Sequence, residues 1–186
     1  MKPKYIKFDI EALSLNELKA KYPQHVWSSW FGSEKFANEE AVAGHYELYF
    51  DYPNSRNKTW DDQQKLLKKG ESVPSAAVVA QALIQHFEKT GKRLLPDSWS
   101  RTNDIDSDGG RVNVGYFDSV GLVVYGRWGG LRDSDLGLAA SRNFVPLKLE
   151  PGKLDVPLEN SNSKFEDGDV ITLNGIKYRK VEDEQS

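Results

Sequence analysis

The sequence predicts a mixed α+β domain, because helical and strand patterns alternate along most of the chain. Residues 74–90 carry apolar side chains at helical spacing, and residues 5–10 alternate apolar and polar side chains as a half-buried strand does. Residues 111–125 contain two short apolar runs around a turn, which is the pattern of a β-hairpin. These observations predict two or more helices packed with short antiparallel strands.

Near the N-terminus, a short helix is predicted over residues 15–21, after the strand at 5–10. Ser14 is its expected N-cap, since a serine hydroxyl can accept a hydrogen bond from the first turn. Residues 39–50 are compatible with either state, because helix formers precede an alternating segment at 45–50.

The clearest helix is predicted from Pro74 to about Thr90. Proline suits a first helical turn, where its missing N–H group costs nothing, and Gly91 is placed to cap the C-terminus. The apolar stripe of this helix indicates core packing. His86 beside the stripe is interpreted as a partly buried histidine, because the three histidines show no metal-ligand spacing.

The segment 100–144 differs in composition from the rest of the chain. It holds eight of the fifteen glycines, contains no lysine, and carries five arginines. Binding surfaces favour Arg, Tyr and Trp and are depleted in Lys. Residues 111–117 and 121–125 are predicted to pair over the turn 118–120, and residues 136–141 to form a further buried strand.

Residues 145–186 are predicted to form a β-rich extension of a first domain spanning residues 1–144. Strand patterns at 169–173 and 176–179 flank Asn174-Gly175, a pair that favours a type I′ hairpin turn. The acidic residues 182–186 are expected to be a frayed tail.

The composition also excludes several classes of protein. The absence of cysteine excludes a disulfide scaffold, thiolate metal sites and a cysteine nucleophile. A net charge of −3 without a basic patch predicts no nucleic-acid partner. No apolar run reaches the roughly 20 residues that cross a bilayer. The N-terminal residues are charged throughout, so we expect no signal peptide.

One string resembles the start of a calcium-binding loop. Asp104, Asp106 and Asp108 alternate before Gly109, as the first ligands of an EF-hand do. The position of the bidentate glutamate is occupied by Gly115, and three carboxylates are fewer than the six to eight oxygens that Ca²⁺ takes. We expect no cofactor, and Ca²⁺ at these aspartates is left as the open alternative to a solvated acidic turn.

Five consecutive stretches of the chain carry a resemblance to a known family. The stretch from about residue 94 to 144 is similar to the C-terminal part of the variable proteins of diversity-generating retroelements. The match rests on LLPDSWSRT (94–102), GRVNVGYF (110–117), GLVVY (121–125), the Trp-centred GRWGGLRDSD (126–135) and LGLAASRNF (136–144). The N-terminal part fits loosely, and the extension beyond residue 144 departs from the family pattern, in which the variable region lies near the C-terminus.

The resemblance implies a C-type lectin-like fold of the formylglycine-generating-enzyme branch, with a variable region at about 111–144. It implies a non-enzymatic protein whose diversified face recognises a protein or glycan on a target cell, from a virion or a cell surface. The oxidase chemistry of the fold's enzyme relatives uses cysteines, which this chain lacks.

By the family pattern, twelve positions form the candidate ligand-binding face. They are Tyr116, Ser119, Val120, Val123, Tyr125, Gly126, Arg127, Gly129, Gly130, Leu131, Asp133 and Ser134. Val123 and Tyr125 are expected on one strand face, opposite Leu122 and Val124. Trp128 and Arg132 are interpreted as framework residues, because the family keeps a Trp and an Arg near these places.

Two other functions are left open. The first is a metal-dependent carbohydrate-active or hydrolytic module that uses Asp104, Asp106 or Asp108. The second is a structural virion protein such as a fibre tip, in which the C-terminal β module mediates trimerisation or attachment. A homo-oligomer is compatible with each of these functions.

Overall fold

A computed structural model describes residues 5–146, 170–173 and 176–179 of the chain. The chain divides into two compact units, Met1–Lys148 and Leu149–Ser186. Within the described residues, the first unit contains helices and two small sheets, and the second contains a single strand pair. The predicted α+β class is therefore confirmed. No helix in the described ranges is both long enough and apolar enough to cross a membrane.

The first sheet brings the N-terminal strand beside the last strand of the unit. Its order is β1 (Ile6–Ile10), β2 (Gly44–Tyr49) and β7 (Ala140–Pro146), with both pairs antiparallel. The predicted opening strand is confirmed, and the ambiguous segment 39–50 contains a strand. The strand covers residues 44–49, and its alternation places Tyr46 and Leu48 in the core.

The second sheet carries the glycine-rich segment. Its order is β5 (Val123–Arg127), β4 (Arg111–Gly115), β3 (Trp99–Ile105) and β6 (Leu136–Leu138). The predicted pairing is confirmed as the antiparallel pair β4–β5, in which Val114 faces Val124, but the connection spans residues 116–122 rather than the predicted turn 118–120. Strand β6 instead runs parallel to β3.

The single strand predicted over residues 136–141 is wrong, because the chain changes sheets there. Residues 136–138 pair with β3, and Ala140 already belongs to β7 in the first sheet. At the junction, the N–H group of Ala139 donates to the carbonyl of Arg101. The residues between the two sheets are small and buried, which lets the chain cross without exposing its backbone.

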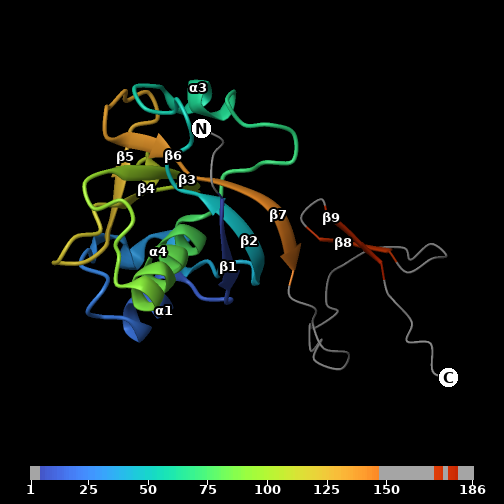
Figure 1. Ribbon diagram of the computed structural model, residues 1–186, viewed down its shortest axis with the longest axis horizontal. Coiled ribbons are helices and arrows are strands. Elements are labelled where there is room, and N and C mark those ends of the chain that lie inside the picture. Colours follow the sequence, from blue (N-terminus) through green and yellow to red (C-terminus); the bar gives the residue numbers. More distant parts are fainter. Residues whose placement is uncertain (1–4, 147–169, 174–175, 180–186) are drawn as a thin grey trace. The chain divides into compact units, whose positions relative to one another are not determined.

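Helix α4 (Ala76–Thr90) forms the centre of the core. It contacts β1 of the first sheet and both β3 and β4 of the second (Figure 1). Gly91 caps it in the left-handed conformation, with φ of 67°, as predicted. Its N-cap is Ser75, whose hydroxyl accepts from the N–H of Val78, so the prediction that Pro74 lies inside the first turn is wrong.

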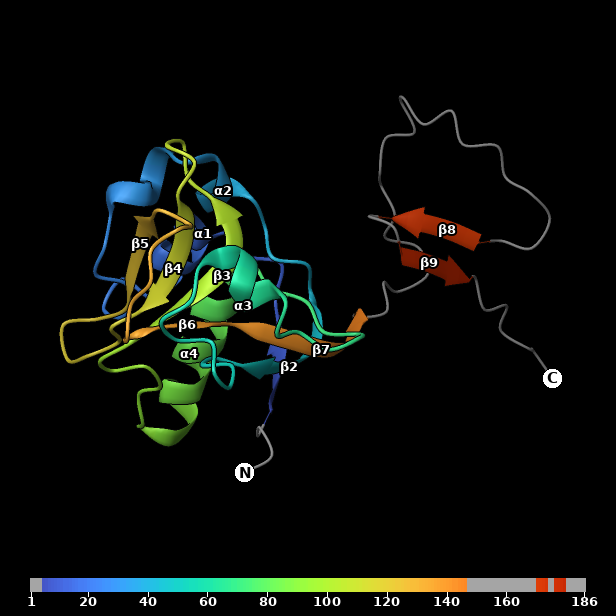
Figure 2. The ribbon, with the colours of Figure 1, turned by 90° about the horizontal axis from the view of Figure 1, so that it is seen from above.

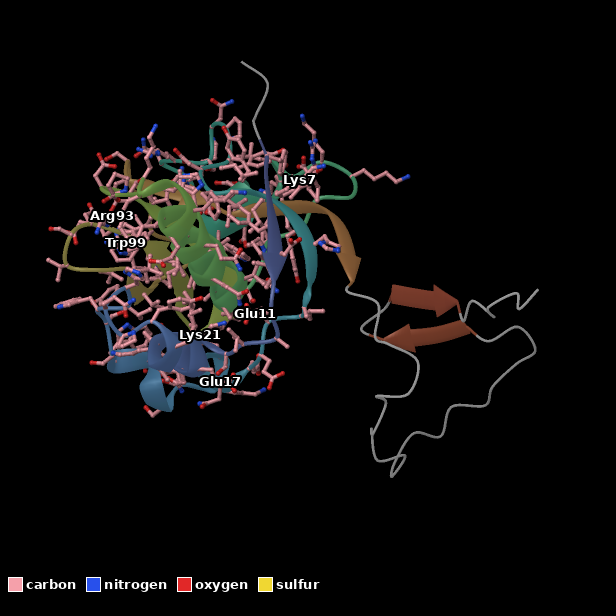
Figure 3. The ribbon with its side chains drawn as sticks, turned by 60° about the horizontal axis from the view of Figure 1, so that its bottom comes forward. Lys7, Glu11, Glu17, Lys21, Arg93 and Trp99 are labelled. Carbon is pink, nitrogen blue, oxygen red and sulfur yellow. The ribbon has the colours of Figure 1, made fainter. Side chains whose placement is uncertain are left out.

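The remaining helices are short. They are α1 (Leu15–Lys21), α2 (Lys35–Asn38), α3 (Trp60–Gln64) and the 3₁₀-helix η1 (Trp30–Ser33). Helix α1 was predicted, and Ser14 and Glu17 cap it reciprocally. Figure 3 shows Glu11, Glu17 and Lys21 around this helix, where Lys21 Nζ lies 2.7 Å from Glu11 Oε2. Helices α3 and α4 lie on opposite sides of the second sheet (Figures 1 and 2).

The second unit is described over two strands. They are β8 (Val170–Leu173) and β9 (Ile176–Arg179), which pair antiparallel with Leu173 opposite Ile176. The predicted hairpin strands are confirmed. The Asn174-Gly175 turn and the acidic tail at 182–186 lie outside the described residues.

Truncation of a core side chain of α4 tests this arrangement. Leu83 is fully buried between the sheets, so Leu83→Ala is expected to lower the free energy of unfolding by about 2–5 kcal/mol. The exposed Lys89 on the same helix is the matched control, and Lys89→Ala is expected to change it by about 0.5 kcal/mol or less. Urea denaturation followed by tryptophan fluorescence measures both values.

Candidate ligand-binding face

The second sheet has one buried face and one partly open face. Val112, Val114 and Val124 are fully buried in the core cluster that includes α4. The alternate residues of β5 point the other way, and Tyr125 is 52% exposed. The predicted alternation of Val123 and Tyr125 against Leu122 and Val124 is therefore confirmed.

The outer face is covered at one end only. Trp60 of α3 packs there with Tyr52 and Leu138, and the guanidinium of Arg111 lies 4.1 Å from the centre of the Trp60 ring. The opposite end, at β5, is not covered in this way, since Tyr125 stays half exposed. Strand β5 is thus the accessible end of the outer face.

Residues 25–30 run beside the outer edge of β5, the edge that does not pair with β4. Trp27 N–H donates to the carbonyl of Leu122 at 3.0 Å, and Leu122 N–H donates back to His25. Further along, the Ser28 hydroxyl accepts from Val124 N–H at 2.8 Å, and the Trp30 indole N–H donates to the Val124 carbonyl. The edge strand is therefore paired partly by side chains of residues 25–30.

This pairing creates a pocket of about 420 Å³ between the segment and β5. Its lining residues are Trp27, Ser28, Ser29, Trp30, Val123, Val124 and Tyr125. Three of them are exposed aromatic residues, with Trp27 at 62%, Tyr125 at 52% and Trp30 at 39%. The rings of Trp30 and Tyr125 stand 6.2 Å apart at 66°, so they form two walls rather than one flat platform.

Sequence reasoning assigned Val123 and Tyr125 to the face but missed Trp27 and Trp30. The available signal was the string HVWSSWF, in which two tryptophans flank two serines. Such a string follows neither a helical nor a strand period, so neither tryptophan is required by a core-facing pattern.

A second layer of aromatic side chains lies beside Tyr125. The centre of the Trp99 ring lies 4.8 Å from the ring centre of Tyr116 and 6.4 Å from that of Tyr125. The Arg127 guanidinium lies 5.2 Å from the centre of the same Trp99 ring. The Tyr116 hydroxyl donates to Asp135 Oδ2 at 2.6 Å, and this hydrogen bond raises the pKa of Tyr116 above its ordinary value. Tyr116 therefore serves in part to support the face.

The loop 128–135 follows β5 and continues the face. Trp128, interpreted from the sequence as a framework residue, is 76% exposed, so its side chain is accessible to a ligand. Arg132 is also exposed and approaches Asp62 at 3.6 Å. Arg127 at the end of β5 forms an ion pair with Asp133 of the loop, with 3.0 Å between Nη1 and Oδ2.

The other predicted positions differ in the room they offer. Ser119, Val120 and Ser134 are exposed, and a Cβ at Gly129 would make only ordinary contacts of 3.6 Å or more. A Cβ at Gly130 would meet the Trp128 ring at 2.4 Å, which an exposed side chain can relieve by turning. Leu131 is half-buried.

Of the three predicted glycines, Gly126 offers the least room for a side chain. It lies on the same side of β5 as the buried Val124, and a Cβ there would come within 1.8 Å of Asp106 Oδ2. A side chain at this position would require the Asp106 carboxylate to move, so of the predicted positions Gly126 is the one least able to accept a larger residue.

The three aspartates of the calcium-like string do not converge on a common point. Asp104 Oδ2 accepts from Ala76 N–H at the start of α4, whereas Asp106 Oδ1 accepts from Asp108 N–H and Gly110 N–H within its own turn. Asp108 is exposed. Among the residues that the structure describes, no group of three or more His, Asp or Glu side chains could hold a metal ion. The described residues therefore give the open alternative of a Ca²⁺ site at these aspartates no support.

Asp104 is nevertheless an unusual carboxylate. Burial raises its pKa to about 6, against the lowering effect of the hydrogen bond from Ala76 N–H. Its position under α4 accounts for this shift without a ligand. We interpret Asp104 as a structural residue that joins the end of β3 to the start of α4.

Comparison with known proteins identifies no relative. No family model matches the chain, and neither a curated protein nor a solved structure matches it. The geometry of the β5 face is therefore the basis for inferring function.

The raised pKa of Asp104 predicts a pH-dependent effect of Asp104→Asn. The pKa of Asp104 is about 6 in the folded protein and 3.8 in the unfolded chain, so the folded protein holds the proton over a higher pH range. The free energy of unfolding therefore falls as the pH rises from about 4 to about 6, because the buried carboxylate becomes charged. The asparagine oxygen can still accept from Ala76 N–H and carries no charge.

We expect Asp104→Asn to match the wild type at about pH 4 and to exceed its free energy of unfolding by on the order of 2–3 kcal/mol at about pH 7.5. Urea denaturation at both pH values measures the difference. A difference that stays the same at both pH values would contradict the assignment.

Proposed function

We propose that this protein is a non-enzymatic binding protein that presents the outer face of β5, the Trp27–Trp30 segment and the 128–135 loop to a partner. The observation that carries the proposal is the pocket with three exposed aromatic walls, Trp27, Trp30 and Tyr125. Exposed large aromatic residues that gather around one concavity are typical of recognition sites, because Trp and Tyr dominate binding hot spots.

The chemistry of the pocket favours a protein partner that inserts an apolar side chain. Among the described residues, no charged side chain lines the pocket, and two of its polar groups, the Ser28 hydroxyl and the Trp30 indole N–H, already bind Val124. A glycan requires several hydrogen-bonding side chains around an aromatic platform, whereas this pocket offers mainly ring faces and a valine. The fit is therefore better for an aliphatic or aromatic side chain.

We further propose that the scaffold is C-type lectin-like and that the face is diversified, as in the variable proteins of diversity-generating retroelements. The resemblance of residues 94–144 supports this reading. So does the structure of the hairpin, whose inward valines are buried while Val123, Tyr125 and the loop side chains remain accessible. The absence of a carboxylate cluster for a metal in the described residues gives the metal-dependent alternative no support.

The diversification part of the proposal predicts a repeat in the neighbouring DNA. We expect a near-copy of the segment that encodes residues 111–144, differing from it mainly at adenines, close to a gene for a reverse transcriptase. Sequencing the flanking DNA checks this expectation. Absence of both the repeat and the reverse transcriptase would remove diversification and leave a binding protein with a fixed face.

The binding part of the proposal is tested with peptides selected from a random display library on the immobilised full chain. We expect Trp27→Ala and Tyr125→Ala each to weaken the selected peptides about 10- to 100-fold, because each substitution removes a wall of the pocket. Ile105→Ala is the matched control, since Ile105 is also 50% exposed but does not line the pocket. Calorimetry measures the affinities.

Two outcomes would contradict the pocket as the binding site. One is a selection that enriches no peptide above background. The other is a set of peptides whose affinity falls equally for the control and for the two aromatic substitutions.

A further inference from the structure

The 128–135 loop is held by its main-chain carbonyls. Six of its eight carbonyl groups accept hydrogen bonds from donors outside the loop. Two arginine side chains supply three of these bonds: Arg101 Nη2 donates to the carbonyls of Trp128 (3.5 Å) and Leu131 (2.7 Å), and Arg56 Nη1 donates to that of Ser134 (3.1 Å). Backbone N–H groups supply the other three, each at 2.8 Å: Trp60 donates to Gly129, Asn57 to Asp133 and Trp99 to Asp135. The donors come from residues 56–60 and from β3.

Arg101 is the central donor of this set. Its side chain is fully buried on the outer face of β3, and its second nitrogen, Nη1, donates to the Lys58 carbonyl at 2.9 Å and to Gln63 Oε1 at 3.0 Å. One guanidinium therefore joins the segment that contains α3 to the loop that follows β5. The planar fork of arginine suits this task, because it presents several donors in a fixed geometry.

The acceptors of Arg101 are neutral. They are three backbone carbonyls and one side-chain amide, and Arg101 forms no ion pair with a carboxylate in the described residues. Burial, aided by the charges of Arg127 and Arg111, lowers the pKa of Arg101 to about 10, so it remains charged at neutral pH. A buried cation without a carboxylate is a costly way to fill a core position. The hydrogen bonds from Arg101 to the main chain of two segments suggest that its task is to hold that main chain.

The side chains of the same loop contribute little to its anchoring. Trp128 is 76% exposed, Arg132 and Ser134 are exposed, and Gly129 has room for a Cβ. The exceptions are Asp133 and Asp135, whose carboxylates bind Arg127 and the Tyr116 hydroxyl, and Arg132, whose exposed guanidinium lies 3.6 Å from Asp62 of α3. Four of the loop positions can therefore change without removing any of the six anchoring hydrogen bonds.

We propose that Arg101 is a positioning residue that fixes the main chain of the 128–135 loop independently of the side chains the loop displays. The loop keeps its shape while positions 128, 129, 132 and 134 vary, and positions 133 and 135 are constrained by their own carboxylate contacts. We call the hydrogen bonds from Arg101 and residues 56–60 to the loop carbonyls the clamp. The use of a loop with a fixed main chain and variable side chains rests on the proposed binding function, whereas the clamp rests on these hydrogen bonds alone.

Amide hydrogen exchange on the full chain tests the clamp. The reporters are the Asn57, Trp60 and Leu131 N–H groups, which donate to carbonyls of the loop, and the α4 amides report on the core. A loop variant that combines Trp128→Ser, Gly129→Ser, Arg132→Ser and Ser134→Ala is expected to leave the three reporters within about 3-fold of the wild type. Arg101→Met is expected to accelerate them at least about 10-fold relative to the α4 amides.

Two further variants keep the test decisive. Arg101→Lys retains the charge without the fork and is expected to give an intermediate acceleration, and it replaces Arg101→Met if the latter does not fold. Arg132→Met, which changes an exposed arginine in the same loop, is the matched control and is expected to have no effect on the reporters.

Two results would overturn the proposal. In the first, the four-position loop variant accelerates exchange at Asn57 and Trp60 as much as Arg101→Met does, which would show that loop side chains hold the loop. In the second, Arg101→Met accelerates the α4 amides equally, which would make Arg101 a general stability residue. No ligand enters this experiment, so an intact clamp combined with failure of the peptide selection would overturn the binding function alone.

Discussion

The burial of one face of the second sheet against helix α4 is the constraint on which the rest of the structure depends. Val112, Val114 and Val124 must lie in the core, and the period of two along a strand then sends Val123 and Tyr125 to the other side. A shift of one residue in β5 would bury Tyr125 and expose Val124. The register of one hairpin therefore decides which side chains of β5 are accessible on the outer face.

Distant parts of the chain complete the face that this register exposes. Residues 25–30 cover the edge of β5 and add two tryptophans to its pocket, while residues 56–60 and Arg101 hold the loop that follows β5. The edge of β5 is paired by the Ser28 hydroxyl and the Trp30 indole as well as by backbone groups, so it is protected from pairing with other strands. The accessible surface thus consists of the aromatic rings of the pocket and the side chains of the 128–135 loop. The main chain of that loop is held by Arg101 and residues 56–60.

Local patterns predicted the parts of this fold that local physics determines. The cap at Ser14, the helix ending at Gly91 and the alternation along β5 each follow from the neighbouring residues. The pocket could not be predicted, because Ser28 and Val124 meet across 96 positions of sequence, and neither residue signals the other. The contacts of Arg101 could not be predicted for the same reason, since its acceptors lie in two segments distant in sequence, residues 58–63 and 128–131. The aspartate string misled because alternation alone does not make carboxylates converge.

The central claim is that a partner binds over β5 between Trp27, Trp30 and Tyr125. The most direct measurement is chemical-shift mapping of a selected peptide on the isotope-labelled full chain. We expect the largest shifts at the Trp27 and Trp30 indole N–H groups and at the amides of residues 123–131. Shifts concentrated at the 104–110 turn, or confined to residues 149–186, would contradict it.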